Sequence, residues 1–235
     1  MVLLGSIINC LLIIIGATIG RIFKGIPEKM KTTVLSIIGL AVAALGIQMS
    51  METTNFVIVI ISLVVGAVIG EWLDLDMQLF RFGKWIETKI GNQASESSVA
   101  EGFINATLFF VIGSMGILGA LDSGIRNDHS VLITKGIIDG FTAIVLSSTL
   151  GIGVMIAAVP VFLYQGTITL LAGLISKYIP EDLLNLFILE MTATGGIMIL
   201  AIGLNIAGLT KIRVANLLPS IVVVGIIVIF IFLFQ

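Results

Sequence analysis

Charged residues are scarce in this sequence, and their scarcity excludes most soluble folds. Only 11% of the 235 residues are charged and 58% are hydrophobic, whereas a typical soluble domain carries roughly 25% charged residues. The mean hydropathy is +1.20. The formal net charge of -2 offers no basic surface of the kind that binds nucleic acid. We therefore expect most of the chain to lie in a lipid bilayer.

Cysteine and proline are also rare. The single cysteine, Cys10, excludes an internal disulfide, and its apolar neighbours indicate a small buried hydrophobic residue. Four prolines beside 26 glycines suit apolar helices that pack closely, because small residues let two backbones approach. The P-loop, HExxH and Gly-x-Ser-x-Gly signatures are absent. We therefore expect neither an enzyme nor a bound cofactor.

Eight apolar runs are candidates for crossing a bilayer, which takes a helix of about 20 residues. They are residues 2–20, 32–50, 55–70, 102–120, 132–150, 153–177, 184–207 and 215–234. The fifth and sixth runs form one apolar stretch that divides at Gly151–Gly153 or, alternatively, at Val159–Pro160. The sequence predicts an all-α, polytopic transmembrane helix bundle in which residues 1–235 form a single integral membrane domain.

Basic residues predict the orientation of these spans. The loops after spans 1, 3 and 7 hold nine of the 12 basic residues: Arg21, Lys24, Lys29, Lys31, Arg81, Lys84, Lys89, Lys211 and Arg213. Cytoplasmic loops carry an excess of Lys and Arg. We therefore expect a multi-pass protein of the plasma (inner) membrane with both termini outside the cytoplasm, unless the bias is accidental.

The longest basic loop, residues 71–100, has two predicted parts. Apolar residues recur at helical spacing with charges between them at Leu75, Leu79, Phe82, Trp85, Ile86 and Ile90. This pattern predicts an amphipathic helix on the cytoplasmic surface. The residues that follow, Gly91–Ser98, are predicted to form a flexible linker. The helix either packs beneath the bundle or binds a partner.

Two internal similarities stand out among the spans. Spans 1 and 3 end in Gly16–Gly20 (GATIG) and Gly66–Gly70 (GAVIG), which are small-xxx-small faces that predict tight helix contact. Spans 4 and 7 each place a glutamate, Glu101 or Glu190, 18 residues before a glycine. Because these spans run in opposite directions, inverted three-helix repeats formed by spans 2–4 and 5–7 are one interpretation. Chance similarity is the other.

Glu190 places one carboxylate inside an otherwise apolar span. A charge at mid-bilayer costs at least about 2.5 to 3.5 kcal/mol on insertion scales, so we expect this side chain to face the bundle interior and a partner. Gly195 and Gly196 follow it, and they predict a broken helix or the close approach of a neighbour. The structural alternatives are a simple hydrogen bond or a pair with Lys135.

Other polar residues inside the spans complete the predicted ion- or substrate-binding set. Carboxylate and amide oxygens are hard ligands that suit cations, and a carboxylate in lipid holds a proton readily enough for proton relay. Besides Glu190, Gly195 and Gly196, the set contains Asp139, Glu101, Asn105, Asn205 and Asn9.

Three of these residues also have structural interpretations. Lys135 lies one turn before Asp139, and an i,i+4 ion pair would neutralise both side chains. Glu101 suits the dipole at the start of a helix. Asn205, together with Asn216, could cap helices.

The only histidine, His129, lies in the polar loop Asp122–Ser130. With Asp122 and Asp128 it could bind a metal. A solvated loop histidine is the plainer interpretation, and no metal is assigned.

Several blocks of sequence together resemble one family. They are AEGFINATLFFVIGSMGILGALDSGIRNDHS, GIIDGFTAIVLSSTLGIGV, YQGTITLLAG, EMTATGGIMILAIGLN and VANLLPS, beside the GSIIN start at Gly5–Asn9. Nearly end to end, the sequence is similar to the bacterial inner-membrane proteins of unknown function typified by YqgA and YdfK. The resemblance implies a multi-span plasma membrane protein and transfers no catalytic or substrate residues.

These observations predict a transporter or channel for a small ion or solute, cation- or proton-linked, with Glu190 and Asp139 in its site. The expected partners are the lipid bilayer and that ion or solute, and a homo-oligomer such as a homodimer is compatible with the sequence. The competing hypothesis is a non-transporting scaffold or sensor that acts through the amphipathic helix of residues 71–90. A scaffold would tolerate neutral replacements of both carboxylates, whereas a transporter would not.

Overall fold

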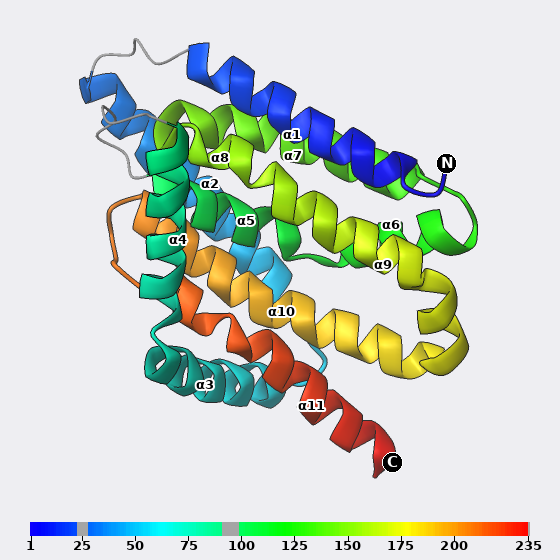
Figure 1. Ribbon diagram of the computed structural model, residues 1–235. Helices are drawn as coiled ribbons and strands as arrows, with labels where there is room; N and C mark the ends of the chain where they lie inside the picture. The colour runs from blue at the N-terminus through cyan, green and yellow to red at the C-terminus, as the bar shows by residue number, and fades with distance from the viewer. Residues whose placement is uncertain (23–27, 91–98, 235) are drawn as a thin grey trace. The chain divides into compact units, whose positions relative to one another are not determined.

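The computed structural model describes residues 1–22, 28–90 and 99–234, and their regular structure is helical throughout (Figure 1). The elements are α1 (Leu4–Ile22), α2 (Glu28–Ser50), α3 (Phe56–Leu73), α4 (Leu75–Ile90), α5 (Val99–Val111), α6 (Ser114–Ile125), α7 (Ser130–Leu150), α8 (Gly153–Ile156), α9 (Ala158–Tyr178), α10 (Glu181–Ile206), η1 (Val214–Leu217) and α11 (Pro219–Leu233). The all-α prediction is confirmed. The predicted linker at residues 91–98 lies outside the described residues.

Helices occupy all eight predicted spans. Six are long and apolar enough to cross a membrane: α1, α3, α7, α8 with α9, α10, and η1 with α11. A seventh candidate is the pair α5 and α6, which is bent by 62°, and α2 contributes the shorter apolar stretch Ser36–Ser50. The predicted division between spans 5 and 6 is confirmed, because α7 ends at Leu150 and Gly151 adopts a φ of +73°.

Local chemistry fixes several helix ends. Asn55 caps α3 by accepting a hydrogen bond from the Val57 N–H at 3.1 Å. Asp74, with a φ of +49°, ends α3 and separates it from α4. Pro180 precedes α10, whose first turn carries Glu181 and Asp182, where carboxylates favour the helix dipole.

The helices gather into two compact units. Unit 1 comprises Met1–Lys31, Leu79–Val111 and Met115–Lys177; unit 2 comprises Thr32–Gln78, Ile112–Ser114 and Tyr178–Gln235. Unit 1 thus holds spans 1, 5 and 6 and span 4 except for Ile112–Ser114, and unit 2 holds spans 2, 3, 7 and 8. Neither unit coincides with the hypothesised repeats of spans 2–4 and 5–7. The single integral membrane domain stays a prediction.

Glycines join α1 to α7 in unit 1, where the two helices lie side by side (Figure 1). A Cβ atom added to Gly16 would lie 2.1 Å from the Gly140 carbonyl oxygen, and one added to Gly20 would lie 2.2 Å from that of Ile144. The residue numbers rise together, so the helices run parallel.

The corresponding motif of α3 forms a second seam within unit 2. A Cβ atom at Gly66 would lie 2.4 Å from the Ser220 nitrogen, and one at Gly70 would lie 1.9 Å from the Asn216 oxygen. The residue numbers run in opposite directions, so α3 is antiparallel to η1 and α11. Both small-xxx-small motifs are therefore packing seams, as the sequence predicts.

The predicted break at Gly195–Gly196 is wrong, because α10 runs without interruption from Glu181 to Ile206. The alternative of close approach is confirmed. A Cβ atom at Gly195 would lie 2.1 Å from Ile112 Cγ2, and one at Gly196 would lie 2.4 Å from the Ser50 nitrogen. These contacts within unit 2 offset the roughly 1 kcal/mol that each helical glycine costs relative to alanine.

The fourth predicted span is the one that bends. Helix α5 ends at Val111, α6 begins at Ser114, and Gly113 between them adopts a φ of +133°, a region that side-chain-bearing residues rarely enter. The fourth predicted span is thus bent and the seventh continuous. The inverted repeats stay a prediction.

The helix predicted between Glu71 and Ile90 is present as α4, which begins at Leu75 because α3 continues to Leu73. The Phe82 ring stacks on Trp85 and packs against Phe103 of α5, both with centroids 5.9 Å apart. Trp85 is nonetheless 57% exposed. The position of α4 on the cytoplasmic surface stays a prediction.

The glycine seam between α1 and α7 can be tested with a matched pair of variants. Gly16→Ala should destabilise the protein by about 1 to 3 kcal/mol, the usual cost of overpacking, because its methyl group would strike the α7 backbone. Gly173→Ala on α9, where an added Cβ atom meets nothing within 4 Å, should be neutral or stabilising by up to about 1 kcal/mol. Thermal unfolding of the purified proteins measures both, and equal effects would contradict the packing role.

Candidate functional site

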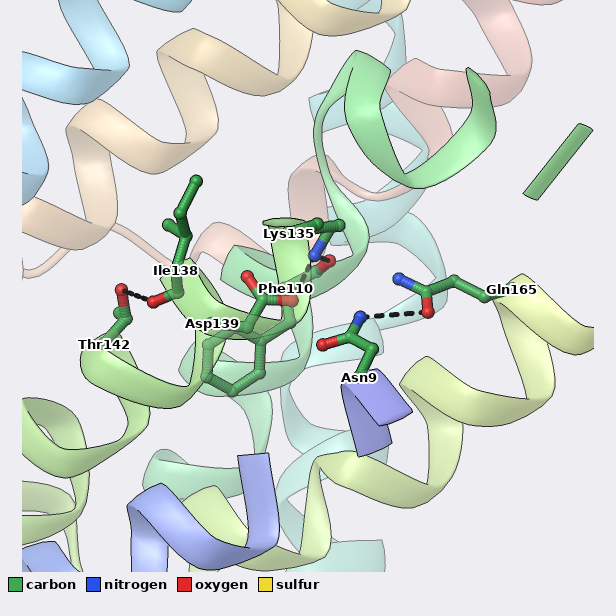
Figure 2. A network of polar contacts seen from close by, with 7 residues as sticks. All are labelled: Asn9, Phe110, Lys135, Ile138, Asp139, Thr142 and Gln165. Atoms are coloured by element: carbon green, nitrogen blue, oxygen red, sulfur yellow. Dashed lines mark hydrogen bonds and ion pairs between the residues drawn. The ribbon is translucent and has the colours of Figure 1, made fainter. Parts of the chain in front are cut away.

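A cluster of buried polar groups lies inside unit 1. It consists of Lys135 and Asp139 on α7, Asn9 on α1, Gln165 on α9 and the backbone carbonyl of Phe110 on α5, and Figure 2 shows these groups turned toward one another. We call these five groups the unit 1 cluster.

Lys135 and Asp139 form an ion pair one helical turn apart. Both residues are buried, at 6% and 4% exposure. The lysine also donates to the Phe110 carbonyl oxygen at 2.8 Å. The bend after α5 leaves the last carbonyls of that helix without their i+4 donors, and in a membrane such groups must be satisfied from within the protein. The local pair that the sequence offers as an alternative for Asp139 is therefore present.

Amide groups form the other side of the cluster. The Asn9 Nδ2 atom donates to Gln165 Oε1 at 2.9 Å, and both residues are fully buried. A Cβ atom added to Gly116 at the start of α6 would lie 3.5 Å from Lys135 Cε and 3.9 Å from Gln165 Nε2. The charged pair and the amide pair therefore border the same glycine.

Part of the hydrogen-bonding capacity of these buried groups is unused. Among the described residues of unit 1, Asn9 Oδ1 and Gln165 Nε2 have no hydrogen-bond partner, and neither do the hydroxyls of Ser6 and Thr169, which follow the same faces of α1 and α9. An unsatisfied buried polar group costs about 1 to 3 kcal/mol, and such groups call for an explanation such as a water, an ion or a ligand. Acceptor, donor and hydroxyl groups near a neutralised charge pair can hold a small polar solute.

Glu190 belongs to unit 2 and has a different environment. Its side chain is fully buried on α10 and accepts three hydrogen bonds from the loop between α2 and α3. The donors are Thr53 Oγ1 at 2.5 Å, Thr54 Oγ1 at 3.0 Å and the Thr54 N–H at 3.2 Å. The expected interior position is confirmed, and the partners are hydroxyl and amide groups in place of Lys135.

The remaining predicted residues lie on α5 and at the end of α10. Glu101 is exposed in the first turn of α5, and Asn105 is buried one turn later. Asn205 closes the loop after α10, because its amide donates to the Ile212 oxygen at 2.7 Å and accepts from Thr210 Oγ1 at 2.7 Å and from the Ile212 N–H at 2.9 Å. Asn205 therefore has the capping role that the sequence offers as its alternative.

The hypothesised joint site of Glu101, Asp139 and Glu190 combines residues of both units. Asp139 and Glu101 belong to unit 1 and Glu190 to unit 2. Their convergence stays a prediction.

The polar loop before α7 is held by local hydrogen bonds. His129 Nδ1 lies 3.0 Å from Ser123 Oγ, and Asp128 accepts from the Ser130 N–H at 2.9 Å, which lowers the pKa of the Asp128 carboxyl group. Nowhere among the described residues do three His, Cys, Asp or Glu side chains gather as a metal site would require. The plainer interpretation of His129 fits this geometry.

Comparison with known proteins identifies the family. Residues 4–229 match the family described as "Protein of unknown function (DUF554)". The chain belongs to this family.

Two relatives of the chain are similar over nearly their whole length. The chain is 39% identical to the uncharacterized membrane protein YdfK of Bacillus subtilis over 224 residues, 93% of each chain. It is 28% identical to the uncharacterized protein YqgA of Escherichia coli over 228 residues, 92% of each chain. No solved structure matches. The resemblance inferred from the sequence blocks is confirmed, and the DUF554 protein described here is a multi-pass membrane protein.

Sequence reasoning missed three residues of these sites in the DUF554 protein. Gln165 carried a usable signal, because it is an amide in the middle of apolar span 6. No local pattern predicts the role of Thr53 and Thr54, since they lie in a short polar loop 137 and 136 residues from the carboxylate that they contact.

The ion pair in the unit 1 cluster predicts strongly non-additive effects of mutation. Asp139→Asn should destabilise the protein by about 3 to 5 kcal/mol, because it leaves the Lys135 charge buried without its partner. Adding Lys135→Met should recover much of that loss. Denaturant unfolding of both single variants and the double variant measures the coupling, and additive losses would contradict the pairing.

Proposed function

We propose that this DUF554 protein transports a small polar solute or ion across the membrane, and that the unit 1 cluster binds this cargo. The observation that carries the proposal is the broken helix of span 4, whose freed Phe110 carbonyl accepts from Lys135 within a buried polar cluster. Non-helical backbone at membrane depth is tolerated where it lines protein or a water-filled cavity, and transporters place binding sites at such breaks.

The energetic cost of the cluster supports this function. Asn9 and Gln165 each keep an unpartnered polar atom inside a fully buried side chain. Ionisable residues in membrane spans are expensive and mark substrate or ion pathways by default. A protein that served only as a membrane anchor could fill the same volume with apolar residues and avoid both costs.

We further propose that transport is linked to a cation or proton. Among the side chains that the structure describes, two carboxylates are buried in the spans, Asp139 and Glu190. Asp139 is compensated by a lysine, whereas the contacts of Glu190 come from neutral donors. Glu190 is therefore the better place for a positively charged partner.

The competing function is a scaffold or sensor that acts through α4. Its support is the exposure of apolar side chains on that helix, including Phe82 at 47% and Trp85 at 57%. Aromatic residues at such positions also suit the membrane interface, so this feature is compatible with either function. The buried cluster has no use in a scaffold.

Transport can be tested with purified protein in liposomes, screened for proton, sodium, potassium and divalent cation flux. Gln165→Leu and Asp139→Asn should each lower the flux about tenfold or more, equivalent to about 1.4 kcal/mol in the barrier. Thr142→Ala is the matched control, because this α7 hydroxyl bonds the Ile138 carbonyl of its own helix at 2.9 Å and lies outside the cluster (Figure 2). Wild-type flux that survives both cluster substitutions would contradict the proposed site.

We propose that both termini lie outside the cytoplasm, on the basis of the basic residues in alternate loops. Single cysteines placed at Ser97 and Asp128 in a Cys10→Ala background should react with a membrane-impermeant thiol reagent from opposite sides. In intact cells only the cysteine at residue 128 should be labelled. Labelling of both from outside would refute this topology.

A further inference from the structure

The charge of Glu190 lacks a basic partner within unit 2. In the sequence of this unit the basic residues are Lys211 and Arg213. Both follow the far end of α10, which lies about 24 Å beyond Glu190 at 1.5 Å per residue. Arg213 instead contacts Glu71. The charge of Glu190 is therefore not balanced by a side chain of its own unit.

An ionised Glu190 needs a positive charge from outside the side chains of unit 2, because an isolated ionised carboxylate is very costly in an apolar interior. The three hydrogen bonds from Thr53 and Thr54 come from neutral donors, so they add no positive charge beside the carboxylate. One monovalent cation completes the neutralisation, whereas a divalent cation would leave an excess positive charge.

The groups around Glu190 are oxygen ligands of the kind that hard cations prefer. Besides the two carboxylate oxygens they include Thr53 Oγ1 and Thr54 Oγ1. A hydroxyl has two acceptor lone pairs beside its one donor, so a rotation about the C–O bond turns a donor to the carboxylate into a ligand.

A separate observation on α10 points to the same place. Thr194 is fully buried, and its Oγ1 atom has no hydrogen-bond partner among the described residues. It lies one turn after Glu190, on the same face of the helix. Because helical side chains lean toward the N-terminus of their helix, the Thr194 side chain leans toward Glu190.

We propose that Glu190, Thr53, Thr54 and Thr194 form a binding site for one sodium ion. Sodium fits better than potassium because a charged carboxylate ligand attracts the smaller ion more strongly, and Na⁺ has nearly the radius of Ca²⁺, which oxygen sites of proteins hold at 2.3 to 2.6 Å. The surface supplies a route, since Thr54 and the neighbouring Glu52 are exposed. The role of this ion as the coupling ion rests on the proposed transport, whereas its binding does not.

The test measures sodium binding without transport, so a failed flux assay would not contradict the proposed sodium site. The unfolding temperature of the purified protein is compared in sodium, potassium and choline chloride at one pH and ionic strength. Sodium should raise it and the other two should not, because a ligand stabilises the folded state that binds it. Glu190→Gln and Thr54→Val should lose this sodium-specific rise.

Two further variants separate binding from folding. Thr54→Ser restores the hydroxyl and should regain the sodium response. Ser62→Ala removes another buried, unpartnered hydroxyl of unit 2 and should leave the response unchanged. Radioactive sodium binding to the same proteins provides a second measurement if Glu190→Gln unfolds.

The proposal is overturned if sodium and potassium stabilise the wild-type protein equally, or if Glu190→Gln retains the sodium-specific response. An unfolding temperature that responds to pH and not to sodium would assign the compensating charge to a proton and would also overturn it.

Discussion

The structure depends on one constraint, which is that a lipid bilayer offers no hydrogen-bond partners. Helices satisfy their own backbone groups, and close helix contact then depends on glycines whose missing side chains let backbones touch. Gly16 and Gly20 do this between α1 and α7, and Gly66 and Gly70 between α3 and the η1–α11 segment. Where the backbone departs from the helix, at residues 112–113, the protein must supply a donor. Lys135 is that donor.

This constraint explains why the polar residues of the spans occur in groups. In unit 1, Lys135 serves both the Asp139 carboxylate and the freed Phe110 carbonyl, so one buried cation compensates two acceptors. In unit 2, a loop at the end of α2 reaches the Glu190 carboxylate with two hydroxyls and one N–H. Each arrangement is dense in hydrogen bonds, and each leaves atoms unpartnered beside it. Those atoms are the basis of both proposed binding sites.

Local sequence patterns predicted most of the fold but only part of these sites. Hydrophobic runs located the helices, and the division at Gly151 and both small-xxx-small seams could be predicted because they follow from adjacent residues. The break was placed at Gly195–Gly196 and lies near Gly113 instead, because a glycine pair serves equally well for a bend or for a close contact. The neighbouring helix determines whether a glycine pair forms a bend or a close contact. In the same way, the bonds from Thr53 and Thr54 to Glu190 join residues far apart in the sequence, and no local pattern encodes them.

The two buried carboxylates differ in how their charge is compensated, and this difference bears on what each site can bind. Asp139 has a covalently fixed counterion one turn away, so the unit 1 cluster is close to neutral and suits a polar solute that exchanges hydrogen bonds with Asn9 and Gln165. The contacts that Glu190 makes among the described residues come from neutral donors, which supply no counterion, so its site suits a small cation. A transporter driven by a cation needs both kinds of site. The proposed cargo and the proposed sodium ion therefore follow from one distinction, the presence or absence of a lysine one turn from the carboxylate.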